Sequence, residues 1–384
     1  MLRHRVLSVI STNDRRGAEV FAVQLAERLQ QDGYQVEVVA LRAAKGEHCA
    51  LDVPVVSKRP TALSGFVSLV RRARDADVLI ANGGTTLWWT CLAGLVSRTD
   101  FVYRNIGDPS EWGRVRFAQW RIGTPLRRAA VVAALYPDAS AFLARRYRID
   151  AERLTTIPNA VPVCAFPLPD DNDRSLAQAS LGLDPNIRWV AFLGALSAEK
   201  QPLMALAALQ SEQDLGLVVA GDGPLAEQCR AAASRFPKER VRLLGRVSDS
   251  RRVLVACDVV VLPSRTEGIS GVAIEAGLSG RPVVASNVGG MSEAIKDEVT
   301  GILVDNPTPD SLVEAIRWAL AHKVAAGTAA RTHCVERFSM DEAGREWARA
   351  LDQAINAATR GGSRRSALLP RSRFRRVAEP NDRA

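Results

Sequence analysis

The sequence predicts an α/β protein with two domains, each built around a parallel β-sheet. Short apolar runs alternate with stretches whose apolar residues recur at helical spacing, which is typical of βαβ units. Most of the apolar runs end in glycine or polar residues, as strands do at a ligand-binding edge. A segment rich in proline and aspartate, residues 162–175, predicts a linker between two series of such units. The chain has 384 residues, which is enough for two domains of ordinary size.

The first series of elements fills the N-terminal half. Residues 6–10 form a buried-strand pattern, 11–17 a loop, and 18–29 a helical pattern that Gly33 ends. Further strands are expected at 36–41, 78–81, 101–103 and 129–136. Because the carboxyl ends of parallel strands meet at one edge of a sheet, the loops 11–17, 82–85 and 104–108 should lie together there.

The second series begins after the predicted linker. Its strands are expected at residues 189–193, 217–220, 241–244, 259–262 and 283–285, each with a polar or glycine-rich end. A last helical stretch, 341–358, carries Trp347, Leu351 and Ile355 on one face. The arginine-rich tail, 359–384, has few apolar residues and is expected to be disordered.

Composition narrows the class of protein. A hydrophobic content of 47% with 24% charged residues is typical of a soluble globular protein. No apolar run reaches the ~18 residues that span a bilayer, and the first residues pass directly into a strand pattern, so neither a membrane span nor a signal peptide is expected. The six cysteines and four histidines lack metal-ligand spacing, which predicts reduced thiols, no metal and a cytoplasmic location.

The net charge of +9 is partly local. Residues 111–129 mix arginine with Trp112, Phe117 and Trp120, a composition suited to acidic lipid headgroups at the inner face of the membrane or to an anionic acceptor. Plain solubility charge is the alternative. Nucleic acid is not expected as a partner, because no binding module for it is present.

The segment PSRTEGISGVAIEA, residues 263–276, carries most of the functional information. Glu267 follows an apolar run, and Glu275 lies in the helix after it, with seven residues between them. A glycine turn at a helix N-terminus binds anions through free N–H groups, so two flanking carboxylates suit the hydroxyl groups of a nucleotide-sugar. Eight residues of helix span up to about 12 Å at roughly 1.5 Å per residue. A glycosidase pair is about 5 to 10 Å apart, so a diphosphate-linked donor fits better.

These motifs resemble those of the family-four retaining glycosyltransferases, which have the GT-B fold. The resemblance covers about residues 1–358 and is strongest over 189–306. The motifs that carry it in the second half are Gly194 with Glu199-Lys200, the GDGP turn at 221–224, Gly245, Pro263-Ser264, Glu267-Gly268 with Glu275-Ala276, and Gly289-Gly290 with Glu293. Gly17-Ala18-Glu19 and Ile157-Pro158-Asn159 match more loosely in the first half.

The resemblance implies two Rossmann-like domains whose parallel sheets face each other across a cleft. Residues 1–165 would form the acceptor-side domain and 166–340 the nucleotide-sugar-binding domain, with a helix at 341–358 crossing back to the first domain. It also implies retention of configuration at the transferred sugar and no metal or other cofactor. A nucleotide diphosphate-sugar would be the co-substrate, and a glycan or lipid-linked precursor the acceptor.

The resemblance also implies a role for each matched residue. Lys200 would neutralise the donor diphosphate, Glu267 would bind the transferred sugar, and Glu275 would accept from the ribose hydroxyls. Gly17 would let the backbone of the first domain approach the diphosphate. The N–H groups at Gly268, Ile269 and Ser270 would hold phosphate oxygens.

The sequence departs from the family pattern at the diphosphate. The family usually carries arginine directly after the glycine of the phosphate motif, whereas this chain has Ala195. Arg246, or alternatively Arg15 or Arg16 of the first domain, is expected to replace that cation.

A second departure lies near the acceptor. The family often has histidine after the strand at 101–103, and here Arg104 and Asp108 are the candidates for contact with the acceptor or the donor sugar.

Two other functions remain open. A catalytically degenerate GT-B module that binds a nucleotide-sugar would retain binding without turnover. A GT-B sugar-nucleotide 2-epimerase would convert a nucleotide-sugar without an acceptor. A nicotinamide oxidoreductase is disfavoured, because no GxGxxG follows the first strand.

Overall fold

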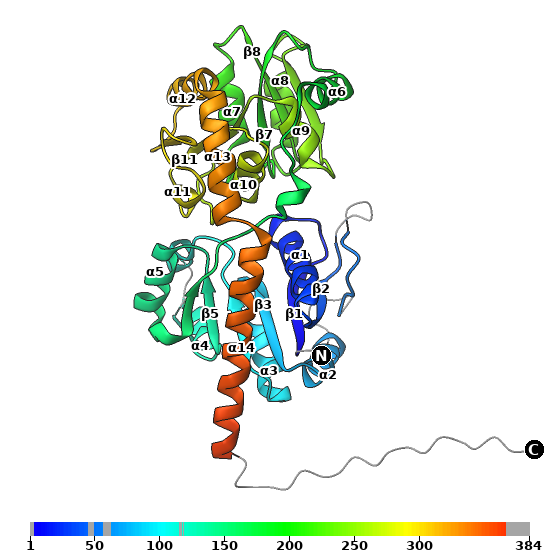
Figure 1. Ribbon diagram of the computed structural model, residues 1–384, viewed down its shortest axis with the longest axis vertical. Coiled ribbons are helices and arrows are strands. Elements are labelled where there is room, and N and C mark those ends of the chain that lie inside the picture. The colour runs from blue at the N-terminus through cyan, green and yellow to red at the C-terminus, as the bar shows by residue number, and fades with distance from the viewer. Residues whose placement is uncertain (1–3, 45–49, 57–62, 115–116, 118, 366–384) are drawn as a thin grey trace, which may run out of the picture.

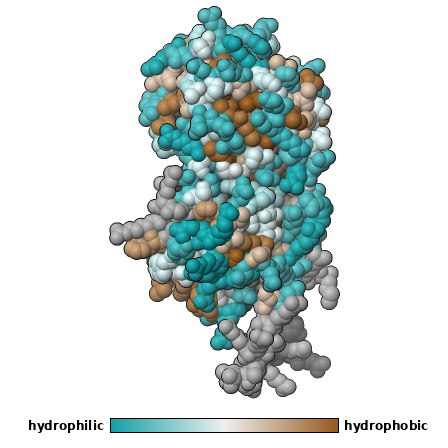
Figure 2. All heavy atoms as spheres, turned by 90° about the vertical axis from the view of Figure 1, so that its left-hand side faces the viewer, coloured by the Kyte–Doolittle hydropathy of each residue, from teal (hydrophilic) through white to brown (hydrophobic). Residues whose placement is uncertain are grey.

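The computed structural model describes residues 4–44, 50–56, 63–114, 117 and 119–365, and in them two parallel six-stranded sheets form two domains. The strand order is β2-β1-β3-β4-β5-β6 in the first sheet and β12-β11-β10-β7-β8-β9 in the second. Figure 1 shows the domains one above the other, and the space-filling side view narrows between them on one side (Figure 2). The predicted α/β class with two Rossmann-like domains is confirmed.

The strands are short, and half of them are buried at every position. Their bounds in the first sheet are β1 (Arg5–Thr12), β2 (Gln35–Arg42), β3 (Val78–Asn82), β4 (Phe101–Arg104), β5 (Val131–Ala134) and β6 (Leu154–Thr156). Those in the second sheet are β7 (Arg188–Leu193), β8 (Leu215–Ala220), β9 (Val241–Gly245), β10 (Val259–Leu262), β11 (Val283–Ser286) and β12 (Gly301–Val304). Burial on both faces explains why the fully buried strands appear in the sequence as continuous apolar runs.

Helices cover both faces of each sheet. The first domain has α1 (Gly17–Gln31), α2 (Leu63–Arg74), α3 (Gly84–Ser97), α4 (Thr124–Leu126) and α5 (Pro137–Tyr147). The second has α6 (Asp171–Leu181), α7 (Pro202–Leu209), α8 (Ala226–Ala233), α9 (Ser250–Ala256), α10 (Gly271–Leu278), α11 (Met291–Ala294), α12 (Pro309–Ala321) and α13 (Lys323–Arg337).

The last helix, α14 (Met340–Arg365), returns to the first domain and packs beside α1 (Figure 1). Its Trp347 and Leu351 are buried against that sheet, as the helical spacing predicts. The helix continues beyond residue 358, where the sequence pattern ends. The last fully buried position is Ala354, so the apolar pattern holds no information about the turns that follow. The rest of the predicted tail, 366–384, lies outside the described residues.

Besides the longer α14, three elements differ from the sequence prediction. The edge strands β6 and β12 were not predicted, because they are short and mostly half-exposed and therefore lack a continuous apolar pattern. Helix α6 begins inside the predicted linker 162–175. Asp170 caps it by accepting from the N–H of Asp173, and the Asp173 carboxylate accepts from the N–H of Asp170. The aspartates that indicated a linker thus form a capping box.

The chain passes between the domains twice, and the two passages pair with each other. The N–H of Val161 donates to Phe338 O at 3.0 Å, and the N–H of Met340 donates to Val161 O at 3.3 Å. Two segments far apart in the sequence therefore form one short hydrogen-bonded hinge.

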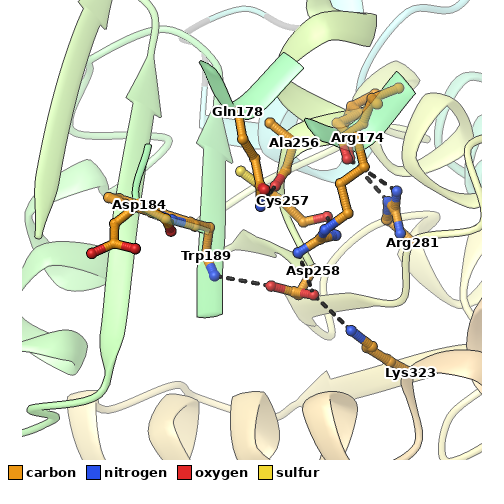
Figure 3. Close-up of polar contacts among 11 residues, drawn as sticks. Arg174, Gln178, Asp184, Trp189, Ala256, Cys257, Asp258, Arg281 and Lys323 are labelled. Atoms are coloured by element: carbon orange, nitrogen blue, oxygen red, sulfur yellow. Dashed lines mark hydrogen bonds and ion pairs between the residues drawn. The ribbon is translucent and has the colours of Figure 1, made fainter. Parts of the chain in front are cut away.

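A buried carboxylate connects three elements at the amino end of β10 in the second sheet. Asp258, 1% exposed, precedes β10 and accepts from Arg174 Nη2 at 2.9 Å, from Lys323 Nζ at 2.9 Å and from the N–H of Trp189 at 3.0 Å (Figure 3). Burial alone would raise its pKa, but the bond from Lys323 and the charge of Arg174 lower the pKa below the usual value. This cluster lies at the end of β10 opposite to Glu267 and joins α6, β7 and α13.

Candidate functional site

The predicted pair Lys200 and Glu267 is brought together at the carboxyl ends of two neighbouring strands. β7 and β10 are hydrogen-bonded neighbours, and the loop after each carries one of the two residues. Lys200 Nζ lies 2.7 Å from Glu267 Oε1, which also accepts from Ser264 Oγ at 2.9 Å. The N–H of Arg265 donates to Glu199 O at 2.8 Å and holds the two loops together. The ion pair is therefore anchored from both loops.

Gly289 and Gly290 pack against the backbone of the loop that carries Glu267. Gly289 has φ +58°, and a Cβ added there would lie 1.9 Å from Glu267 O. The N–H of Gly290 donates to Gly268 O at 2.8 Å. A side chain at Gly289 would displace the backbone at Glu267, so glycine is required for close approach as well as for the positive φ.

The N-terminus of α10 offers amide donors beside Glu267. Gly268, Ile269 and Ser270 are buried, and among the described residues no acceptor is bound to their N–H groups. These groups, together with the positive end of the helix dipole, suit a phosphate oxygen.

Glu275 lies one turn into α10, half-buried, on the side of α9. Its Oε2 accepts from Ser250 Oγ at 2.6 Å. Burial raises the pKa of Glu275 to about 7, the bond from Ser250 opposes this rise, and the charge of Asp249 adds to it. The carboxyl group is thus balanced between its neutral and charged forms near neutral pH.

The first domain places Gly17 at the start of α1, exposed and with open space around its Cα. Beneath this loop lies Arg104, 2% exposed, with its guanidinium stacked 3.8 Å from the ring centroid of Phe21. Arg104 donates to Ala18 O at 3.1 Å and to Asn82 Oδ1 at 3.2 Å. Burial lowers the pKa of Arg104 to about 9, and the negative charge of Glu19 opposes this effect.

Asn159 connects Arg104 to the second domain, a contact that sequence reasoning missed. Its Oδ1 accepts from Arg104 Nη2 at 2.8 Å, and its Nδ2 donates to Ile269 O at 2.7 Å. Asn159 was noted only as part of a family motif, and no local pattern indicates a partner 110 residues away. The buried Arg104 of the first domain is therefore linked through Asn159 to the loop before α10 in the second.

Asp108 lies at the same junction. Its Oδ1 accepts from the N–H of Ser110 at 2.8 Å, and its side chain also faces the hydroxyl of Tyr136. Burial and then the charge of Asp108 raise the pKa of that hydroxyl well above its usual value. Tyr136 also packs closely against Gly290, where an added Cβ would lie 2.6 Å from Tyr136 Cδ1. Tyr136 therefore lies between Asp108 and the glycine pair of the second domain.

The candidate replacements for the missing cation occupy different places. Arg246 is exposed and follows β9, three strands from β10 and therefore about 14 Å away across the sheet. Arg15 and Arg16 are exposed before α1. Arg265, which sequence reasoning missed, is exposed in the loop between β10 and α10 that carries Glu267. Its backbone bond to Glu199 O places it beside Lys200, and its position in PSRTEG was the available signal.

In the part of the chain that the structure describes, no three His, Cys, Asp or Glu side chains gather as a metal-ligand set. The described helices also include none that is both long and apolar enough to cross a bilayer.

Two Rossmann-like domains whose strand ends meet at a site with a lysine, two glutamates and a helix N-terminus define a glycosyltransferase of the GT-B fold. The model of "Glycosyltransferase Family 4" matches residues 15–163, and that of "Glycosyl transferases group 1" matches 174–322. A D-inositol 3-phosphate glycosyltransferase of Mycobacterium sp. (strain KMS) is 30% identical in an alignment of 337 residues that covers 77% of this chain and 75% of that protein. The chain belongs to glycosyltransferase family 4.

Other relatives agree with this assignment. The D-inositol 3-phosphate glycosyltransferase of Segniliparus rotundus is 31% identical over 239 residues, and the match spans 59% of this chain and 51% of that protein. Among solved structures, HepE of Anabaena in complex with UDP-glucose has a TM-score of 0.80 at 22% identity, covering 91% of this chain and 100% of HepE. Sucrose-phosphate synthase of Thermosynechococcus elongatus has a TM-score of 0.75 at 20% identity, covering 92% and 100%. The GT-B fold that the sequence predicts is confirmed.

Proposed function

We propose that this protein is a retaining, metal-independent glycosyltransferase that moves a sugar from a nucleotide diphosphate donor to an anionic or lipid-linked acceptor at the inner face of the membrane. The observation that carries the proposal is the grouping of Lys200, Glu267 and the free N–H groups of 268–270 at one edge of the second sheet. Such a group provides a cation, a carboxylate that accepts from hydroxyl groups, and N–H groups that donate to phosphate, all within a region that a nucleotide-sugar can span.

The proposal assigns a donor contact to each of these groups. The diphosphate lies between Lys200 and the N-terminus of α10, the sugar hydroxyls donate to Glu267, and the ribose hydroxyls donate to Glu275. Arg265 supplies the second cation more directly than Arg246, because its loop is fixed beside Lys200. HepE, a neighbour of the same fold, binds UDP-glucose, so uridine diphosphate sugars are the first donors to test.

The transfer step keeps the configuration of the sugar. The bond from the anomeric carbon to the donor phosphate breaks, and the acceptor hydroxyl forms its new bond on the same face. The hydroxyl proton passes to the departing phosphate oxygen, whose negative charge Lys200 and the amide groups stabilise. Arg104 acts as a positioning residue, since its guanidinium contacts protein atoms and holds the Gly17 loop.

The test is a thermal-shift panel of UDP, GDP and ADP with their common sugar conjugates, on the wild type and on Glu275→Ala. A ligand that binds the native protein raises the melting temperature. One nucleotide should do so, with a smaller shift in the variant. The anomeric configuration of the product, followed by NMR with and without EDTA, then tests retention and metal independence.

Ala195 favours a second candidate, a nucleotide-sugar-binding module without turnover, because it removes an expected cation from the diphosphate. Donor binding without sugar transfer to any acceptor would support this module. Loss of donor binding in Arg265→Ala, but not in Arg246→Ala, would instead identify the compensating cation of an active enzyme.

A further inference from the structure

Helix α3 is apolar all round, yet one of its faces is open. Its sequence, GTTLWWTCLAGLVS, contains no charged residue. A helix of that composition is normally buried on every side. In this structure Leu92 is 43% exposed, Leu95 45% and Val96 53%. The outer face of α3 is therefore an apolar surface without a protein partner among the described residues.

These exposed residues form a continuous stripe with Trp88, which is half-buried. Trp88, Leu92, Leu95 and Val96 follow one another at i, i+4, i+7 and i+8, which places them on one face of the helix. Trp120 of the short helical segment 119–123 extends the stripe. It is 66% exposed, and its ring lies 5.6 Å from that of Trp88. Trp88 Nε1 donates to Arg121 O at 2.6 Å and fixes the segment to α3.

Trp112, by contrast, does not belong to this surface. Its ring packs 6.3 Å from that of Tyr103 and 6.4 Å from that of Tyr147, against the core. The basic aromatic stretch predicted at 111–129 therefore divides into an interior part and an exposed part around Trp120 and Arg121. Residues 115, 116 and 118 lie outside the described part of the chain.

Arginines surround the stripe. Arg121 adjoins its first turn, and Arg98 caps the C-terminal end of α3. Arg128 lies close to the buried Cys91 of α3, where its positive charge opposes the rise that burial causes in the pKa of that thiol. All three arginines are exposed. The acidic residue nearest to α3 in sequence is Asp100, beyond its end.

We infer that the stripe Trp88–Leu92–Leu95–Val96, extended by Trp120, is a docking surface for an anionic phospholipid bilayer. An apolar face with tryptophan at its border and guanidinium groups around it matches the acyl boundary and the phosphate layer of a membrane interface. A protein partner would have to supply acidic groups around an apolar centre, and a second copy of this chain would bring the same arginines together.

The position of α3 relates this surface to the site. Helix α3 begins directly after β3, at the edge where the strand ends carry the candidate site. At roughly 1.5 Å per residue, the stripe extends from about 6 Å to about 18 Å along the axis from Gly84. The surface therefore starts about 6 Å along the helix axis from the edge that carries the candidate site. The inference rests on the proposed function only in naming the source of the acceptor, because bilayer binding requires no donor.

The test uses flotation of the full chain with two kinds of vesicle, phosphatidylcholine alone and an equal mixture of phosphatidylcholine and phosphatidylglycerol. The variant is Leu92→Gln with Leu95→Gln, and the control is Val324→Gln, since Val324 is 76% exposed in the other domain. The wild type and the control should float with the mixed vesicles. The double variant should partition at least about tenfold more weakly, because two apolar side chains leave the bilayer.

Three outcomes would overturn the inference. The wild type could remain unbound to anionic vesicles. The double variant could float as well as the wild type, which would assign binding to the arginine-rich tail. Sedimentation could also show a dimer that the double variant dissociates, without vesicle binding, which would make the stripe a contact between copies. A UDP thermal shift on the same double variant should be unchanged, so a failure of docking is distinguishable from a failure of the donor site.

Discussion

The carboxyl group of Glu275 predicts that donor affinity depends on pH. Its pKa is raised to about 7 by burial, and Ser250 and Asp249 are the groups that face it from α9. The ribose hydroxyls can donate to both oxygens only when the carboxyl is ionised, because the neutral form uses one oxygen as a donor. Nucleotide binding should therefore strengthen as the pH rises through this pKa.

The magnitude follows from the ionised fraction. With a pKa of about 7, about a tenth of the carboxyl groups are ionised at pH 6 and about nine-tenths at pH 8. The dissociation constant should then fall by up to about tenfold, or about 1.4 kcal/mol, over that interval. The pH dependence of folding stability has the opposite sign to that of donor affinity. A raised folded pKa means that the free protein loses stability as the pH rises from the unfolded value through about 7.

The assay is calorimetric titration of UDP at pH 6, 7 and 8 and constant ionic strength, with the wild type and Glu275→Gln. The nucleotide phosphate also titrates in this range, but it contributes equally to both proteins, so the difference between the two profiles reports Glu275. Glu314→Gln, an exposed site on α12, is the control for a lost glutamate charge. Parallel profiles for the wild type and Glu275→Gln would refute the reasoning, as would wild-type affinity of that variant at pH 8.

Three further predictions concern the remaining contacts. Asp258→Ala removes the partner of Arg174 and Lys323 and should lower the free energy of unfolding by about 3–5 kcal/mol. This corresponds to a fall in Tm of about 6–20 °C at about 2–4 °C per kcal/mol. The affinity for UDP, measured by calorimetry, should not change. Gly289→Ala should lower kcat at least about tenfold, because the added Cβ meets Glu267 O. Gly182→Ala, with a similar φ of +64° and its nearest contact at 3.9 Å, should leave kcat unchanged in the same transfer assay. Lys200→Ala should weaken UDP binding at least about tenfold, whereas equal binding would exclude its role at the diphosphate.

The sequence predicts the fold class and the central strands, because those strands are buried on both faces and their apolar runs are continuous. Edge strands such as β6 and β12 contact the core on fewer sides, and their residues carry a mixed pattern. The aspartates at the start of α6 indicate a linker as well as a helix, since a helix cap and a turn use the same residues.

The candidate site also contains residues that the sequence predicts and contacts that it does not. Lys200 and Glu267 were predictable because each follows a strand of a parallel sheet, and the edge of that sheet brings them together. The burial of Arg104 and its link through Asn159 to Ile269 depend on how the two domains meet. A contact between domains leaves no periodic trace in either segment, so no sequence pattern predicts it.

The paired passages at Val161, Phe338 and Met340 limit how the domains can move. Two independent tethers would let one domain twist and translate freely, but two hydrogen-bonded tethers act as a single pivot. Rotation about that pivot displaces distant points most and nearby points least. Asn159, two residues from Val161, is close to the pivot, so its bond to Ile269 tolerates small rotations.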